Sequence, residues 1–148
     1  MVRAMAGADV RDPYDLRRFI EAQAPVYDRV RAELGRGRKS SHWMWFIFPQ
    51  ISGLGRSPMA ERFAIKSLRE AEAYLDHPIL GTRLRECARL VNEVKGRSIG
   101  EILGHPDDLK FRSCMTLFAR ASADDEVFTA ALNKYFGGEP DRATIERI

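Results

Sequence analysis

The residues best suited to chemistry gather in one short aromatic segment, residues 42–50, with the sequence HWMWFIFPQ. It contains both tryptophans of the chain, Trp43 and Trp45, next to His42 and followed by Gln50. On a helix, side chains two positions apart point about 200° away from each other, so we expect one indole to face the core and the other a groove. In one interpretation both are core material; in the other, one indole stacks on a base or a sugar. If the protein is catalytic, His42 is the natural acid or base, because it is the only histidine in this cluster.

Two loops rich in glycine and cations flank the aromatic segment. Residues 35–41 read GRGRKSS, and residues 50–58 read QISGLGRSP. Backbone amides at the start of a helix bind anions, and arginine adds bidentate contacts to phosphate. Neither loop matches the Walker pattern or the GxGxxG fingerprint, so the indication comes from the pair of loops rather than from either one. The candidate ligand-binding residues in these loops are Arg38, Lys39, Gln50, Arg56 and Ser57.

Polar side chains also interrupt stripes that should face the interior. Gln23 continues the helical stripe of Leu16, Phe19 and Ile20, and a buried amide without partners costs about 1–3 kcal/mol. Tyr27 poses the same question one helix later. Both belong either to a structural hydrogen-bond network or to the floor of a polar pocket. Lys110 and Ser113, one turn apart, lie at the edge of another apolar face, where the lysine extends to solvent or supplies a cation to the same pocket.

The remaining reactive residue types do not form a recognisable site. Cys87 and Cys114 lie on apolar helix faces and are expected to be inert core thiols, and two cysteines argue against an oxidised scaffold. The three histidines have no metal-ligand spacing, and no HExxH, CxxC or GxSxG motif occurs. We therefore expect neither a bound metal nor a cofactor.

Helix punctuation recurs along the whole chain, and strand alternation is scarce. Residues 42–48 are expected to be a buried helical segment capped by Ser40 or Ser41, since a single strand would have no partner. Seven or eight helices joined by short connections predict one compact all-α domain over residues 1–148, with residues 1–11 as a flexible tail. The predicted helix-start signals are Asp12-Pro13, Ser57-Pro58, the capping boxes Ser67–Glu70 and Ser98–Glu101, Asp107 or Asp108, Asp124 and Asp141.

Composition limits the classes of function. The chain has 148 residues, of which 45% are hydrophobic and 30% charged, the balance of a globular protein. No apolar run approaches the roughly 20 residues needed to cross a bilayer, and the N-terminus lacks a signal-peptide core, so we expect a cytoplasmic protein that does not enter membranes. A net charge of +3 is too small to indicate a nucleic-acid binder. The basic stretch 29–39 is either a solvated helix end or an anion-contacting loop.

The chain also resembles a known family over roughly residues 15–147. Its members are small, all-helical and mostly bacterial proteins of unknown function, and some carry a calpastatin label that does not suit a compact helical chain. The matching stretches are DLRRFIEAQAPVYDRV, GRKSSHWMWFIFPQISGLGRS, EAEAYLDHPILGTRLREC, DDLKFRSCMTLF and KYFGGEPDRATI, of which SHWMWFIFPQ is the most specific. The resemblance implies a right-handed superhelical arrangement of helices and no established reaction. At the level of architecture the chain is also similar to the helical NADAR proteins, which are linked to ADP-ribose and NAD derivatives.

Three hypotheses of function follow. The first is a protein that binds, and as an enzyme would hydrolyse, a small anionic nucleotide-like ligand such as an ADP-ribose derivative. In it Trp43 or Trp45 stacks on the ring and cations hold phosphate, while Gln23, Tyr27 and Gln50 orient the ligand. The second is a non-enzymatic protein–protein interaction module with an exposed apolar patch and a partner that the sequence does not identify. The third and least favoured is an RNA or DNA binder that uses residues 29–39.

Overall fold

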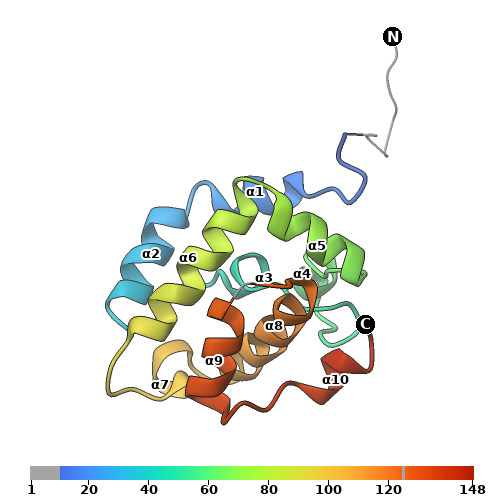
Figure 1. The fold of residues 1–148 in the computed structure, drawn as a ribbon. Helices are drawn as coiled ribbons and strands as arrows, with labels where there is room; N and C mark the ends of the chain where they lie inside the picture. The colour runs from blue at the N-terminus through green and yellow to red at the C-terminus, as the bar shows by residue number, and fades with distance from the viewer. Residues whose placement is uncertain (1–10, 125) are drawn as a thin grey trace.

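The computed structural model describes residues 11–124 and 126–148 (Figure 1). Within these residues, all the regular secondary-structure elements are helices. The predicted all-α fold is confirmed. The described residues form ten helices rather than seven or eight, because α3, α4, α7 and α10 are short helices of four or five residues. The flexible tail predicted for residues 1–11 lies outside the described residues, apart from Arg11. The helices are α1 (Arg17–Gln23), α2 (Tyr27–Gly35), α3 (Met44–Ile47), α4 (Pro58–Arg62), α5 (Leu68–Asp76), α6 (Leu80–Glu93), α7 (Ile99–Leu103), α8 (Asp107–Ala121), α9 (Glu126–Phe136) and α10 (Arg142–Ile145).

Helix α8 is the central element of the core. It packs against α5, α7, α9 and α10, and every residue from Ser113 to Phe118 on it is buried (Figure 1). A helix that is buried on most of its circumference needs neighbours on all sides, which the surrounding helices supply. Phe111 of α8 packs edge-on against Phe48, with ring centroids 5.0 Å apart, so α8 also fixes the aromatic segment. Helix α6 forms a second layer against α2, α5 and α9.

Several predicted helix starts are confirmed by their hydrogen bonds. The Ser98–Glu101 capping box is complete, and Asp141 caps α10 through the backbone amide of Thr144. The helix predicted to start at Asp12-Pro13 begins only at Arg17, and its N-cap Leu16 has no side-chain cap, although Asp12 accepts hydrogen bonds from the amides of Leu16 and Arg17. Each of these contacts spans five residues or fewer, so local sequence specifies it.

Other predicted caps are wrong or only half formed. Helix α8 begins after Pro106, and Asp107 and Asp108 lie inside its first turn instead of capping it. The Ser67 hydroxyl caps α5 as predicted, but the carboxylate of Glu70 accepts from the Lys66 amide rather than closing the box. The cap predicted at Asp124 lies next to residue 125, which is outside the described residues, and stays a prediction.

The aromatic segment is helical, as predicted, but neither serine caps it. Helix α3 begins after Trp43, and no side chain caps its first turn. The Ser41 hydroxyl instead donates to the carboxylate of Glu33 at 2.6 Å.

A closed loop follows α3. Ile51 and Ile65 form an isolated parallel β-bridge, in which the Ser52 amide donates to Ile65 O at 2.7 Å and the Ile65 amide donates to Gln50 O at 2.8 Å. This bridge fastens both ends of the loop 51–65, which contains α4. The loop is compact, because a Cβ on Gly55 would lie only 2.6 Å from Ala60 Cβ.

No helix in the described part of the chain is both long enough and apolar enough to span a membrane.

Candidate functional site

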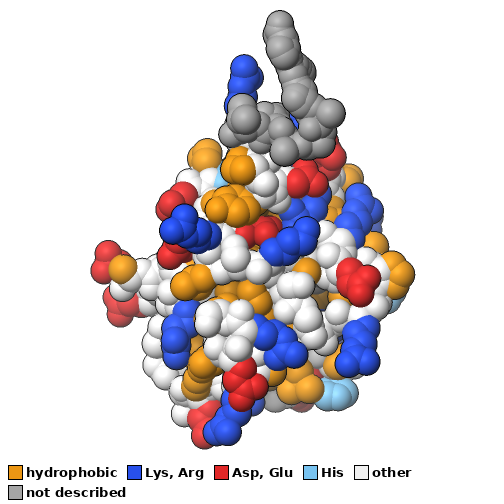
Figure 2. Space-filling model, turned by 90° about the vertical axis from the view of Figure 1, so that its right-hand side faces the viewer, with side chains coloured by type: hydrophobic (Ala, Val, Ile, Leu, Met, Phe, Trp, Pro, Cys, Tyr) orange, Lys and Arg blue, Asp and Glu red, His pale blue; other side chains and the backbone are white. Residues whose placement is uncertain are grey.

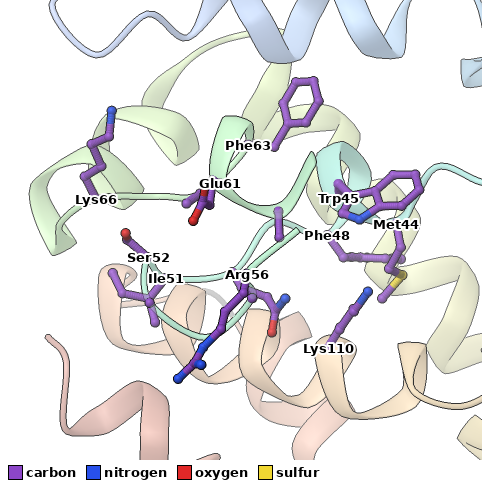
Figure 3. A pocket seen from close by; sticks show the side chains of 15 residues that line it. Met44, Trp45, Phe48, Ile51, Ser52, Arg56, Glu61, Phe63, Lys66 and Lys110 are labelled. Carbon is purple, nitrogen blue, oxygen red and sulfur yellow. The ribbon is translucent and has the colours of Figure 1, made fainter. Parts of the chain in front are cut away.

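A cavity of about 570 Å³ lies between the segment 44–66 and helix α8 (Figure 3). Its size is within the range of small-molecule sites, which is about 300–1,000 Å³. Apolar side chains of Met44, Phe48 and Phe63 form part of its wall, and charged and amide side chains form the rest. The predicted site residues that line it are Trp45, Gln50, Arg56 and Lys110.

Trp45 and Lys110 lie together at one end of this cavity. In Figure 3, Lys110 extends from α8 towards Trp45, and its ammonium nitrogen is 5.9 Å from the centre of the indole ring. Asp107, one turn earlier on α8, lies 3.7 Å from the same nitrogen. The other oxygen of Asp107 binds Lys39 at 3.0 Å, and Lys39 in turn lies 5.1 Å from the ring centre of Trp43. One carboxylate therefore positions two lysines, each of them next to a tryptophan.

Three further charged side chains of the cavity have no partner within the described part of the protein. Arg56, Glu61 and Lys66 line the cavity and form no ion pair with any described residue. With Lys110, the wall has three cations and one carboxylate, so its formal charge is positive. Figure 2, which views the side of α4, α5 and the C-terminus, shows lysine and arginine side chains around a central group of hydrophobic ones. Unpaired cations can bind the charged group of an anionic ligand, and an apolar wall can pack against its ring.

The two tryptophans separate as predicted, one in the core and one at the cavity, although Trp43 precedes α3 instead of lying on it. Trp45 is half-buried and lines the cavity, whereas Trp43 is 1% exposed and belongs to the core. The indole nitrogen of Trp43 donates to the carboxylate of Glu33 at 2.9 Å. Trp45 is therefore the indole available for stacking.

The first glycine-rich loop has its amides already occupied. The amides of Ser40 and Ser41 both donate to Glu33, at 2.8 and 3.1 Å. Burial alone would raise the pKa of Glu33, but these bonds and those from the Ser41 hydroxyl and Trp43 lower it to about 2. An internal carboxylate thus binds the amides of Ser40 and Ser41, and Asp107 binds Lys39, so the phosphate site on this loop stays a prediction.

Gln23 and Tyr27 belong to a structural network rather than to the cavity. The Gln23 amide donates to Phe46 O at 2.7 Å and to the Tyr74 hydroxyl at 3.1 Å, and its oxygen accepts from Arg83 at 3.3 Å. The Tyr27 hydroxyl donates to Glu86, across the contact between α2 and α6. Of the two interpretations left open by the sequence, the contacts match the structural network.

The other predicted site residues also lie outside the cavity. His42 and Arg38 are exposed and do not line it, so the structure does not place His42 where it would move a proton of a ligand bound there. The Ser57 hydroxyl caps α4 by accepting from the Ala60 amide at 3.1 Å. The Ser113 hydroxyl donates to Asp141, which joins α8 to α10.

Sequence reasoning missed Ser52, Glu61 and Lys66. Glu61 is one of many surface-type glutamates in the sequence, and Lys66 directly precedes a helix cap, so neither stands out locally. Only the bridge between Ile51 and Ile65 brings them to the same cavity.

The thiols are buried, as predicted, and do not contribute to the site. Burial raises the pKa of Cys87 to about 12 and raises that of Cys114 well above its ordinary value. Over residues 11–124 and 126–148, no three histidine, cysteine, aspartate or glutamate side chains gather as metal ligands would.

Comparison with known proteins assigns the chain to a family. Residues 13–148 match the model of DUF1810, described as a protein of unknown function, and the chain belongs to this family. A crystal structure of the conserved hypothetical protein Rv1873 from Mycobacterium tuberculosis, at 1.38 Å, is similar to this chain. The two share 61% sequence identity over 91% of this chain and 96% of that one, with a TM-score of 0.90. No match was found among curated proteins.

Proposed function

We propose that the cavity between the segment 44–66 and α8 binds a small anionic nucleotide-like ligand, such as an ADP-ribose derivative. The observation that supports this most strongly is the presence of a half-buried indole, Trp45, in the same wall as three cations, of which Arg56 and Lys66 have no ion-pair partner among the described residues. Both cations are exposed, so water solvates them in the free protein and they remain available to a ligand. A bound anion would use both.

The proposed roles follow from position in the cavity. Trp45 stacks on the ring system, with Lys110 beside it to contact a nearby anionic group. Arg56 holds phosphate, because a guanidinium binds it through two parallel hydrogen bonds. Gln50 orients the ligand through its amide. The proposal is restricted to binding, since His42, the expected acid or base, does not line the cavity.

The two alternative functions receive less support from the described residues. Ile79 and Leu109 are the only large hydrophobic side chains classed as exposed in the part of the chain that the structure describes, and they belong to different segments, which gives a docking patch less support than the cavity receives. Within the basic stretch 29–39, Arg31 is paired with Glu86 and Lys39 with Asp107, which reduces the charge available to nucleic acid.

The experiment is isothermal titration calorimetry of the purified protein with AMP, ADP, NAD and ADP-ribose at two salt concentrations. We expect at least one nucleotide to bind, and to bind more weakly at high salt, because exposed cations are screened. Arg56→Ala should lower that affinity about tenfold, the effect of losing one charged hydrogen bond. Arg69→Ala, on the exposed face of α5 and outside the cavity, is the matched control and should leave affinity unchanged. Absence of binding by all four nucleotides, or equal losses in both variants, would contradict the proposal.

A further inference from the structure

The two ends of the cavity differ in chemistry. Trp45 and Lys110 stand at one end in Figure 3, and Ser52, Glu61 and Lys66 stand at the other, whereas Arg56 extends below Glu61 with its guanidinium directed away from Trp45 in that view. The Trp45 end offers a ring surface and a cation. The Glu61 end offers a carboxylate, which accepts hydrogen bonds from hydroxyl groups, beside the hydroxyl of Ser52 and the ammonium of Lys66.

Glu61 is the unusual residue in a cavity that otherwise favours anions. Its carboxylate lines the cavity and forms no hydrogen bond or ion pair with a described residue, although Arg56 and Lys66 line the same cavity. A carboxylate weakens the binding of a simple phosphate through like-charge repulsion. It strengthens the binding of a ligand that places hydroxyl donors there, because an ionised carboxylate only accepts hydrogen bonds.

A second cavity lies beside the first and shares two lining residues with it. Its volume is about 680 Å³, the shared residues are Glu61 and Lys66, and its other lining residues include Tyr14, Arg18 and Glu70. Four carboxylates and three cations line it, so the balance of charge changes from positive in the first cavity to slightly negative in the second. Phosphate groups are therefore favoured in the first cavity, and a neutral group rich in hydroxyls is favoured towards the second.

We infer that the ligand is a nucleoside diphosphate with a terminal sugar, and that Glu61 accepts hydrogen bonds from the hydroxyl groups of that sugar. The inference rests on the proposed function, and it specifies the ligand further: a base stacked on Trp45, phosphates at Lys110 and Arg56, and a sugar at Glu61. Glu61 is a specificity residue in this assignment, because it distinguishes a nucleotide with a terminal sugar from one that ends in phosphate.

The test compares ADP-ribose with ADP by calorimetry in the full chain and in two variants. In the unmodified protein we expect ADP-ribose to bind about tenfold more tightly than ADP, the contribution of a charged hydrogen bond. Glu61→Ala should remove this preference, and it should leave ADP binding equal or tighter because a negative charge has been removed. Glu72→Ala, which removes an exposed glutamate outside both cavities, should keep the preference.

Two results would overturn the inference while leaving the proposed function intact: equal affinities for the two nucleotides in the unmodified protein, or a preference that persists in Glu61→Ala. Failure of both nucleotides to bind would instead contradict the proposed function, and the inference with it. Glu61 is exposed and lies on a short helix, so its replacement is expected to leave the fold unchanged, and the melting temperature of Glu61→Ala checks this directly.

Discussion

The indole nitrogen of Trp43 donates a hydrogen bond to the carboxylate of Glu33 at 2.9 Å, inside the core. Both residues are almost fully buried, with exposed fractions of 1% and 2%. The same carboxylate accepts from the amides of Ser40 and Ser41, so one side chain of α2 fixes the whole connection from α2 to α3. Through that connection it sets the position of Trp45, two residues further on.

Glu33 should make the stability of the protein depend on acid pH. Its pKa is lowered from the ordinary value of 4.5 to about 2, because four hydrogen bonds outweigh the effect of burial. A group whose pKa is lower in the folded state stabilises the fold above its unfolded pKa and loses that effect as pH falls through the folded value. We therefore expect the free energy of unfolding to decrease as pH falls from about 4.5 towards 2.

Glu33→Gln should remove much of this dependence. At pH 7 the variant should lose about 2 kcal/mol, because a charged acceptor of buried donors has been replaced by a neutral one. Urea unfolding at several pH values measures both effects, with the exposed Glu72→Gln as control. A variant that is as stable as the unmodified protein at pH 7 would show that the hydrogen bonds of Glu33 do not stabilise the fold.

Asp107 should stabilise the folded protein mainly through its ion pair with Lys39, and less through its ion pair with Lys110. The side chain of Lys39 is only 9% exposed and its ammonium lies 3.0 Å from Asp107, whereas Lys110 is more exposed and more distant from it. Asp107→Asn leaves a nearly buried cation without a counter-charge, which should cost about 2–3 kcal/mol. Asp108→Asn removes the charge beside the exposed His105 and keeps an oxygen that can accept from the Leu109 amide, so it should cost less than about 1 kcal/mol. Thermal unfolding of both variants checks the difference, and equal losses would contradict it.

Two helical glycines should respond in opposite ways to alanine. A Cβ on Gly81, in α6, would overlap the carbonyl oxygen of Leu75, so the backbone must shift to accept it. Gly81→Ala should therefore destabilise the protein by about 2 kcal/mol or more. A Cβ on Gly100, in α7, would meet nothing closer than 3.8 Å, and alanine favours helix by up to about 1 kcal/mol. Urea unfolding of Gly100→Ala should show unchanged or higher stability, and a loss similar to that of Gly81→Ala would refute this description of the packing.

Local sequence predicted the features that depend on neighbouring residues. The cap at Asp141 and the Ser98–Glu101 box each arise within one short motif. Each of the four short helices, α3, α4, α7 and α10, coincides with a predicted helical segment or start signal, so only the expected total of seven or eight was too low.

Features that depend on distant residues were not predictable. The box expected at Ser67 is incomplete because Glu70 also binds Arg18, which lies 52 residues away in sequence. Ser41 does not cap α3 because Glu33 takes its hydroxyl, and the identity of the buried tryptophan follows from the same carboxylate. Glu61 and Lys66 line the cavity because the β-bridge between Ile51 and Ile65 closes the loop that contains Glu61 and precedes Lys66. No local sequence pattern predicts that bridge.

The most direct test of the ligand-binding proposal is a titration of intrinsic tryptophan fluorescence with ADP-ribose. The two tryptophans respond differently, because Trp43 is buried and Trp45 lines the cavity. A stacked base should quench the emission of Trp45 in a saturable manner, and Trp45→Phe should lose this signal while remaining folded. Saturable quenching that disappears in Trp45→Phe is the predicted result. The proposal would be contradicted by quenching that persists in Trp45→Phe, or by the absence of any saturable change at ADP-ribose concentrations up to about 1 mM.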